Sequence, residues 1–464
     1  AATDVVPDSP TNNFATLNPL VSSGGSPTLS EGNLKLVGSG TDYDTSYATI
    51  AVTSGKWYAE FLYVSGDDRG IFGVVREDRL YYVNGSNYIG SIDDTYGIDF
   101  RARAYTGTSA TSSSGSELFD TTNFDTGDIG LLCFDIDNGK LWFGRRDVSG
   151  SATIWYDSSG NNNGDPSAGS NPTYTFTATG STWYIGCHDY NGTTIIANFG
   201  QDGSFAGSLT SQGASDAGGI GDFNYIESGF LALCTSNLPD ITIGPGQTEQ
   251  ANDFFDTILY LGNGNELAVG TGGMRRPLDT ITIAKSLKFN HGDSSFLSYQ
   301  PGAAGDTKKM TYSAWVKRAD LDKYQIMFQA VDSAYDAFWI TADGIIQIIL
   351  GSTSTAIVTS TRELKDVRTW YHLCLNIDTT QSTASDRIKL WINGIQETLD
   401  TSSGGFPAQD ATFSGWFKSG VTQRINFEGG STYGSGYFAE IHATEGTIYD
   451  YTYFGQVGAN DDWI

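Results

Sequence analysis

The sequence predicts an all-β protein made of two antiparallel β-sandwiches joined by a small connector. Glycine is abundant, with 57 residues, and aromatic residues make up 13% of the chain, whereas charged residues make up only 17%. Antiparallel sheets and their turns use aromatic residues with Gly, Ser and Thr. A long helical protein would instead be rich in Ala, Glu, Lys and Leu. Short apolar runs recur along the chain, and no window of useful length shows a helical period.

The first sandwich is expected over residues 32–205. Apolar runs of the strand type occur at residues 57–61, 70–75, 131–136, 141–143, 184–187 and 194–199. Asn138-Gly139 stands between two of these runs. Both residues tolerate positive φ, so this dipeptide predicts a tight hairpin.

Two segments flank this region and lack strand patterns. Residues 1–31 are polar and carry four prolines, which predicts an extended arm packed on a neighbouring subunit or on the first sandwich. Residues 206–280 begin with a run of Gly, Ser and Ala and are interpreted as a linker with a small connector.

The second sandwich is expected over residues 281–464. Strands are predicted at residues 287–290, 312–317, 325–329, 337–341, 345–350, 371–377, 388–392 and 437–441. An internal similarity links the two halves, because residues 132–137 (LCFDID) correspond to residues 373–378 (LCLNID). The motifs KLWF at 140–143 and KLWI at 389–392 follow in the same order. The same pair of strands is therefore expected in both sandwiches.

The charge excludes some classes of partner. Lys and Arg total 26 and Asp and Glu total 53, for a net charge of −27. No basic stripe is available for nucleic acid, and an anionic membrane surface would repel the chain. The longest apolar runs are far shorter than the roughly 20 residues of a membrane-spanning helix. The four cysteines have no paired spacing, which favours buried thiols over a zinc site or a disulfide framework.

The first half resembles the SPRY domain. The matching residues are Trp57-Tyr58-Ala59-Glu60-Phe61, Gly70 to Val74, Gly127 to Gly130 and Ala197-Asn198-Phe199-Gly200. The second half resembles laminin-G-like and concanavalin-A-like jelly rolls. Its matching stretches include Leu287 to Asn290, Tyr312 to Val316, Trp370 to Leu373 and Lys389 to Gly394. Both resemblances imply sandwiches of two antiparallel sheets.

The whole arrangement is similar to virion proteins of tailed bacteriophages, especially marine ones. The similarity lies in residues 10–19, in residues 229–234 with 237–239, and in residues 437–442 with Phe454-Gly455. It implies a tail fibre, tail-tip protein or capsid appendage that recognises host-surface glycan or protein, with other virion proteins as partners and a homo-oligomeric state. The alternative is a purely architectural decoration subunit without a ligand, and a further alternative is a polysaccharide depolymerase.

Calcium is the expected ion, because it takes oxygen ligands from carboxylates and carbonyls. Candidate ligands in the second sandwich are Asp293, Asp332 and Asp336. Other acidic groups of the first sandwich are Asp93, Asp94 and Asp99, and Asp157 with residues 161–163 and Asp165. The alternative is that all of these residues are solvated turn acids.

Aromatic rings beside polar groups are the expected glycan-binding residues, because apolar sugar faces stack on rings while polar groups bind the hydroxyls. The candidates are Tyr81, Tyr82, Asn84, Tyr88, Tyr449, Tyr451 and Tyr453. The alternative is that these rings pack against a neighbouring subunit.

No catalytic residue is assigned. Glu440 and Glu445 are spaced as in laminarinase-type enzymes, but His442 stands where those enzymes carry Asp. A strand period of two would simply place Glu440 and His442 on one face. The four scattered histidines at 188, 291, 372 and 442 favour core or surface roles over metal binding.

Overall fold

The computed structural model is built almost entirely from antiparallel strands and turns. It describes residues 5–23, 27–38, 40, 43–83, 86–107, 116–120, 123–147, 149, 152–177, 180–238, 282–331, 335–351, 357–429, 432–457 and 463–464. Helical structure in these ranges is limited to single 3₁₀ turns. None of the helices described is long and apolar enough to cross a membrane.

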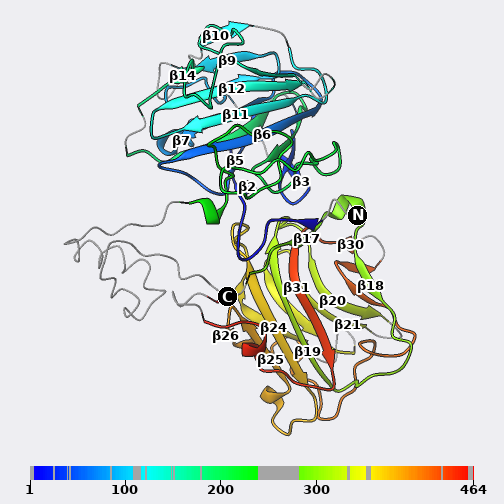
Figure 1. Cartoon of the computed structure of the whole chain (residues 1–464). Coiled ribbons are helices and arrows are strands. Elements are labelled where there is room, and N and C mark those ends of the chain that lie inside the picture. The colour runs from blue at the N-terminus through cyan, green and yellow to red at the C-terminus, as the bar shows by residue number, and fades with distance from the viewer. Residues whose placement is uncertain are drawn as a thin grey trace, which may run out of the picture. The chain divides into compact units, whose positions relative to one another are not determined.

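The chain divides into two compact units. Unit 1 comprises residues 1–8 and 12–238, and unit 2 comprises residues 9–11 and 239–464. Figure 1 labels many of the strands of each unit. A two-residue strand, β1 (Val5–Val6), precedes the sheets of unit 1.

Unit 1 is a sandwich of two antiparallel sheets. The first has the order β13 (Ala152–Trp155), β12 (Lys140–Asp147), β11 (Ile129–Asp135), β6 (Lys56–Ser65), β16 (Thr194–Asn198), β4 (Lys35–Val37) and β3 (Thr28–Ser30), with β14 (Tyr174–Thr175) also on β12. The second has the order β10 (Ser116–Asp120), β9 (Arg103–Thr106), β8 (Thr95–Asp99), β7 (Ile71–Arg76), β15 (Trp183–Asp189), β5 (Asp44–Ala48) and β2 (Leu17–Ser23). Phe61 of the first sheet stacks on Phe72 of the second at 4.9 Å between ring centroids.

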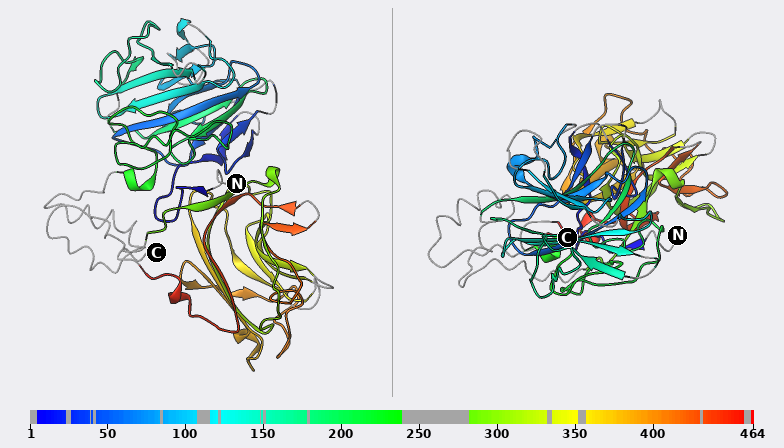
Figure 2. Two further views of the ribbon diagram at one scale, coloured as in Figure 1. Left: turned by 45° about the vertical axis from the view of Figure 1, so that its right-hand side comes forward. Right: turned by 90° about the horizontal axis from the view of Figure 1, so that it is seen from above.

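Unit 2 is a second sandwich, whose strands curve in two layers in the left view of Figure 2. One sheet contains β17 (Ser286–Phe289), β31 (Gly436–Glu445), β19 (Lys309–Arg318), β24 (Tyr371–Asp378), β25 (Ile388–Ile392) and β26 (Ile395–Gln396) in this order. The other contains β18 (Leu297–Tyr299), β28 (Gln423–Ile425), β20 (Gln325–Val331), β21 (Tyr335–Ile340), β22 (Ile345–Ile349), β23 (Ile357–Glu363) and β27 (Leu399–Asp400). A small hairpin of β29 (Phe427–Gly429) and β30 (Thr432–Tyr433) lies beside them. Tyr312 joins the layers through its contacts with Phe328 and Phe338.

The two units share one strand topology. The order β12, β11, β6, β16, β4 in unit 1 corresponds to β25, β24, β19, β31, β17 in unit 2. The internal similarity falls on equivalent strand pairs and in equivalent register, because Cys133 lies opposite Trp142 and Cys374 lies opposite Trp391. The expected repeat of one strand pair is confirmed. All four cysteines are free and buried, also as expected.

The division of the chain differs from the boundaries expected from sequence. Phe14 and Leu17, placed in an extended arm, lie in the core of unit 1 with no exposed surface. Phe223 and Phe230, placed in the connector, belong to the same core. Residues 206–238 cover the outer face of the first sheet, since the Phe223 ring packs on Tyr58 of β6 and the amides of residues 224 and 225 donate to the buried Glu60 carboxylate. In residues 206–238 the aromatic residues are widely spaced among Gly and Ser, so the sequence shows no strand pattern there. These aromatic side chains nevertheless pack against the first sheet and bury its outer face.

Candidate functional site

A hollow of about 570 Å³ lies on unit 2, on the face of the β31–β19–β24 sheet that is turned away from the core. The chain that follows β31 forms its other wall. The residues that line it are Thr282, Ile283, Ser313, Trp315, His372, Glu440, His442, Thr444, Tyr449, Thr452, Tyr453, Phe454, Gly455, Gln456 and Ile464. This volume lies within the range typical of small-molecule sites.

A β-bulge in β31 brings polar residues into this hollow. Ser313 pairs with His442 and Trp315 pairs with Ala439, so Glu440 and Ile441 together stand opposite Ala314. The extra residue shifts the alternation of side chains, and His442 therefore joins the outer face. His442 Nε2 lies 3.5 Å from Glu440 Oε2, and both side chains are about half exposed, at 47% and 56%.

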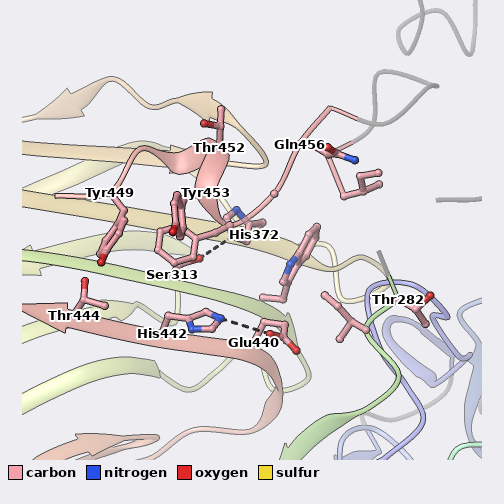
Figure 3. A pocket seen from close by; sticks show the side chains of 15 residues that line it. Thr282, Ser313, His372, Glu440, His442, Thr444, Tyr449, Thr452, Tyr453 and Gln456 are labelled. Atoms are coloured by element: carbon pink, nitrogen blue, oxygen red, sulfur yellow. Dashed lines mark hydrogen bonds and ion pairs between the residues drawn. The ribbon is translucent and has the colours of Figure 1, made fainter. Parts of the chain in front are cut away.

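The sheet side of the hollow also contains a buried hydrogen bond. Ser313 Oγ and His372 Nε2 lie 2.8 Å apart, as the dashed line in Figure 3 shows. Burial, together with the neighbouring His442, lowers the pKa of His372 to about 3, so its ring is neutral at physiological pH. The rings of Trp315 and Trp463 lie 5.1 and 5.6 Å from that of His372.

The wall opposite the sheet is aromatic. The turn η6 (Tyr451–Tyr453) is capped by Asp450, which accepts a hydrogen bond from the Thr452 amide. The rings of Tyr449 and Tyr453 lie 4.9 Å apart, and Tyr453 is 74% exposed. Figure 3 shows these two rings facing the side of the hollow that carries His442 and Glu440.

Glycines fix the last residues of this wall. A Cβ atom at Gly394 would lie 2.2 Å from the nearest atom of the Trp463 ring, and one at Gly455 would lie 2.6 Å from it, so any larger residue would collide with this ring. Gln456 and Ile464 exchange two backbone hydrogen bonds. The wall is therefore held on unit 2 by the packing of Trp463 as well as by its own turns.

The structure separates the aromatic residues predicted to bind glycan. Tyr449 and Tyr453 line the hollow, whereas Tyr451 stacks on Trp391 at 5.3 Å. In unit 1, Tyr81 is 84% exposed, and Tyr82 and Tyr88 pack against a small core cluster. Asn84 lies outside the described residues.

Asp336, one of the predicted calcium ligands, has a structural role instead. It is fully buried, and its carboxylate accepts hydrogen bonds from the amides of Gly351, Gly415 and Trp416 at 2.7–3.0 Å. Burial raises its pKa. Asp293 is exposed and bonds to Asn290, and Asp332 lies outside the described residues. The described part of the chain holds no cluster of three or more His, Cys, Asp or Glu side chains suited to a metal.

The other predicted acidic groups are occupied by local partners. Asp93 and Asp94 form ion pairs with Arg79 and Arg76, and Asp99 pairs with Arg101. Asp157 accepts hydrogen bonds from Ser159 and Asn161, and Asp165 accepts them from Ser167 and Ala168. Asn162 accepts one from the Trp155 amide. These are the turn geometries that Asp and Asn adopt without a metal.

Sequence reasoning missed the sheet side of the hollow, namely Ser313, Trp315 and His372. A signal was present, because Thr311, Ser313 and Trp315 alternate with core residues along β19. His372 is likewise a polar residue in the apolar strand β24. Such alternation identifies an outer face, but it does not say which outer face is hollow.

In unit 1 the equivalent face is closed by residues 206–238. Glu60 of β6 occupies the position equivalent to Trp315 and has no exposed surface. Its carboxylate accepts hydrogen bonds from the amides of Asn224 and Tyr225 and from the Asn198 side chain. Burial raises the pKa of Glu60 to about 7 in spite of these donors.

We expect the wild type to be more stable than Glu60→Gln by a larger margin at pH 5 than at pH 8. The folded state binds the Glu60 proton more tightly than the unfolded chain, so the stability that this proton provides is complete below about pH 4.5 and is lost as the pH rises through 7. Thermal unfolding of both proteins across this range measures the margin. The exposed Glu77→Gln is the control, and a margin that grows toward pH 8 would contradict the expectation.

Comparisons with known proteins place unit 2 in a broad fold class. Residues 291–445 match the family model Laminin_G_3, described as the concanavalin A-like lectin/glucanases superfamily. No curated protein matches the chain. The solved structures similar to the chain include the SPRY domain of human HERC1, with 14% identity over 39% of this chain and 96% of that domain and a TM-score of 0.28.

Two other similar structures come from different proteins. One is a heptameric SAP-like pentraxin from Limulus polyphemus, with 15% identity over 32% of this chain and 68% of the pentraxin chain and a TM-score of 0.24. The other is domain 4 of AbnA, a GH43 extracellular arabinanase from Geobacillus stearothermophilus, in complex with arabinotriose. It shows 16% identity over 38% of this chain and 78% of that domain, with a TM-score of 0.27. The family match and the observed sheets together make unit 2 a concanavalin-A-like, laminin-G-like β-sandwich.

Proposed function

We propose that this chain is a non-enzymatic structural protein of a bacteriophage virion and that unit 2 binds a host-surface glycan in the hollow beside β31. The observation that carries the binding proposal is the pairing of two walls. The rings of Tyr449 and Tyr453 form one wall, and a carboxylate, imidazoles and hydroxyls form the other. Sugars present the complementary surfaces, an apolar ring face and an edge of hydroxyls.

The non-enzymatic part of the proposal rests on the acids of the hollow. Glycoside hydrolysis commonly uses two carboxyl groups that flank the scissile bond. Glu440 is the carboxylate among the described residues that line the hollow, and Glu445 is not among them. Incubation of the protein with bound polysaccharide, followed by an assay for reducing ends, tests this part, and sustained release of sugar would contradict it.

We expect Tyr453→Ala to weaken glycan binding about tenfold and to leave the melting temperature unchanged. The ring is 74% exposed, so it contributes contact area to a ligand and little to folding. Screening on a glycan array, followed by calorimetric titration of the best ligand, measures the effect. Tyr299→Ala is a matched control, because Tyr299 is 69% exposed on unit 2 and lies outside the hollow.

The virion part of the proposal rests on the sequence similarity of three stretches to phage structural proteins. Mass spectrometry of purified phage particles tests whether this chain is part of the virion. Antibody labelling in electron micrographs would show where on the particle the chain lies. A chain that is present on particles but binds no glycan would favour the architectural alternative.

A further inference from the structure

We infer that the hollow takes a neutral saccharide and that Glu440 is the residue that anchors it; this inference rests on the proposed glycan-binding function. Three observations carry the inference: the backbone of Glu440, the position of its carboxylate, and the charge of the hollow.

The backbone of Glu440 is strained for a residue with a side chain. Its φ is +47°, in the left-handed region that glycine adopts freely, and it lies within the ten-residue strand β31. Such a conformation is unfavourable for a non-glycine residue, because its Cβ crowds the neighbouring backbone. Glycine would relieve this cost and keep the bulge. The backbone conformation of the bulge therefore does not require a glutamate side chain. A role for this side chain in the hollow explains why glutamate is present.

The carboxylate of Glu440 is placed to accept hydrogen bonds from a ligand. His442 Nε2 lies 3.5 Å from one of its oxygens, and the glutamate side chain is 56% exposed, so the carboxylate is accessible from the hollow. A carboxylate has two oxygens and can accept from two adjacent hydroxyls at once. Figure 3 shows Glu440 and His442 on the β31 side of the hollow and the Tyr453 ring on the other side. A sugar ring stacked on Tyr453 would present its hydroxyl edge to Glu440.

The charge of the hollow selects against anionic sugars. Its described lining contains one carboxylate side chain, that of Glu440, the two imidazoles of His372 and His442, and no lysine or arginine. His372 is neutral because burial lowers its pKa to about 3. The whole chain carries a net charge of −27, which repels acidic ligands at long range. A neutral saccharide supplies hydroxyl donors to the Glu440 carboxylate, and the negative charge of the protein does not repel it.

The test compares Glu440→Gly with the wild type on an array of neutral glucan, mannan and galactan oligosaccharides beside acidic alginate and sulfated galactan oligosaccharides. We expect the wild type to bind neutral members. We expect Glu440→Gly to bind the best of them at least tenfold more weakly, as the loss of a charge-assisted hydrogen bond predicts, and to melt at the same or a higher temperature. Glu440→Gln keeps one acceptor and should lose less.

Asp410→Gly is the matched control, because Asp410 is also an exposed acid with positive φ (62°) on unit 2, outside the hollow. It should bind the saccharide as the wild type does. Wild-type affinity in Glu440→Gly together with a loss in Tyr453→Ala would overturn the role of Glu440 and leave the glycan site standing. A preference for acidic sugars would overturn the ligand class, and a wild type that binds no saccharide would overturn the proposed function itself.

Discussion

Asp336→Ala should lower the free energy of unfolding of unit 2 by about 3–5 kcal/mol. The Asp336 carboxylate receives three backbone amides at a site without solvent exposure. Alanine leaves these donors unpaired, and each buried unpaired donor costs about 1–3 kcal/mol. Two of the donors belong to Gly415 and Trp416, which are far from β21 in sequence, so the loop that contains the Trp416 ring should loosen first.

Hydrogen exchange read by mass spectrometry in peptides from β20 to β22 and in the peptide that contains Gly415 and Trp416 measures this effect within unit 2. Asp336→Asn, which retains one acceptor oxygen, should be intermediate, and the exposed Asp293→Ala should change stability by less than about 0.5 kcal/mol. Millimolar calcium should not restore Asp336→Ala. If calcium stabilised the wild type but not this variant, Asp336 would be a metal ligand after all.

Phe223→Ala should destabilise unit 1 by about 3–5 kcal/mol, the usual cost of emptying a buried aromatic site. The ring has no exposed surface and makes an edge contact with Tyr58 at 5.1 Å. Its backbone exchanges two hydrogen bonds with Ala214, which hold the covering segment together. Because the neighbouring amides of residues 224 and 225 bond to Glu60, loss of the ring should also expose that buried carboxylate.

Urea unfolding of the full chain, with peptides of β6 and β16 followed by hydrogen exchange, measures the loss in unit 1. Thr210→Ala is the control in the same segment, because Thr210 is exposed. If Phe223→Ala unfolded like the wild type, residues 206–238 would act as the linker that their composition predicts rather than as part of the core.

The fold class, the repeated strand pair and the central strands of both sandwiches, such as β6, β11, β19 and β24, could be predicted from the sequence alone, whereas most short and edge strands could not. Strand residues such as those of β11 and β24 alternate between two faces, and this period of two is a local property of the chain. The Cys and Trp of each repeat are therefore paired in equivalent register, Cys133 with Trp142 and Cys374 with Trp391. Tyr449 and Tyr453 were among the residues predicted to bind glycan, and the structure places both in the lining of the hollow, whereas Tyr451, chosen by the same local pattern, packs on Trp391.

The residues that lie on the outer faces of the sheets could be known only from the folded chain. Whether Phe223 covers a sheet, whether Asp336 meets amides or solvent, and whether Ser313 and His372 come together depend on contacts between residues 59 to 165 positions apart. The bulge at Glu440 shows the physical reason most clearly. One extra residue in β31 reverses the face on which His442 lies, and no period of the sequence marks where the partner strand skips a residue.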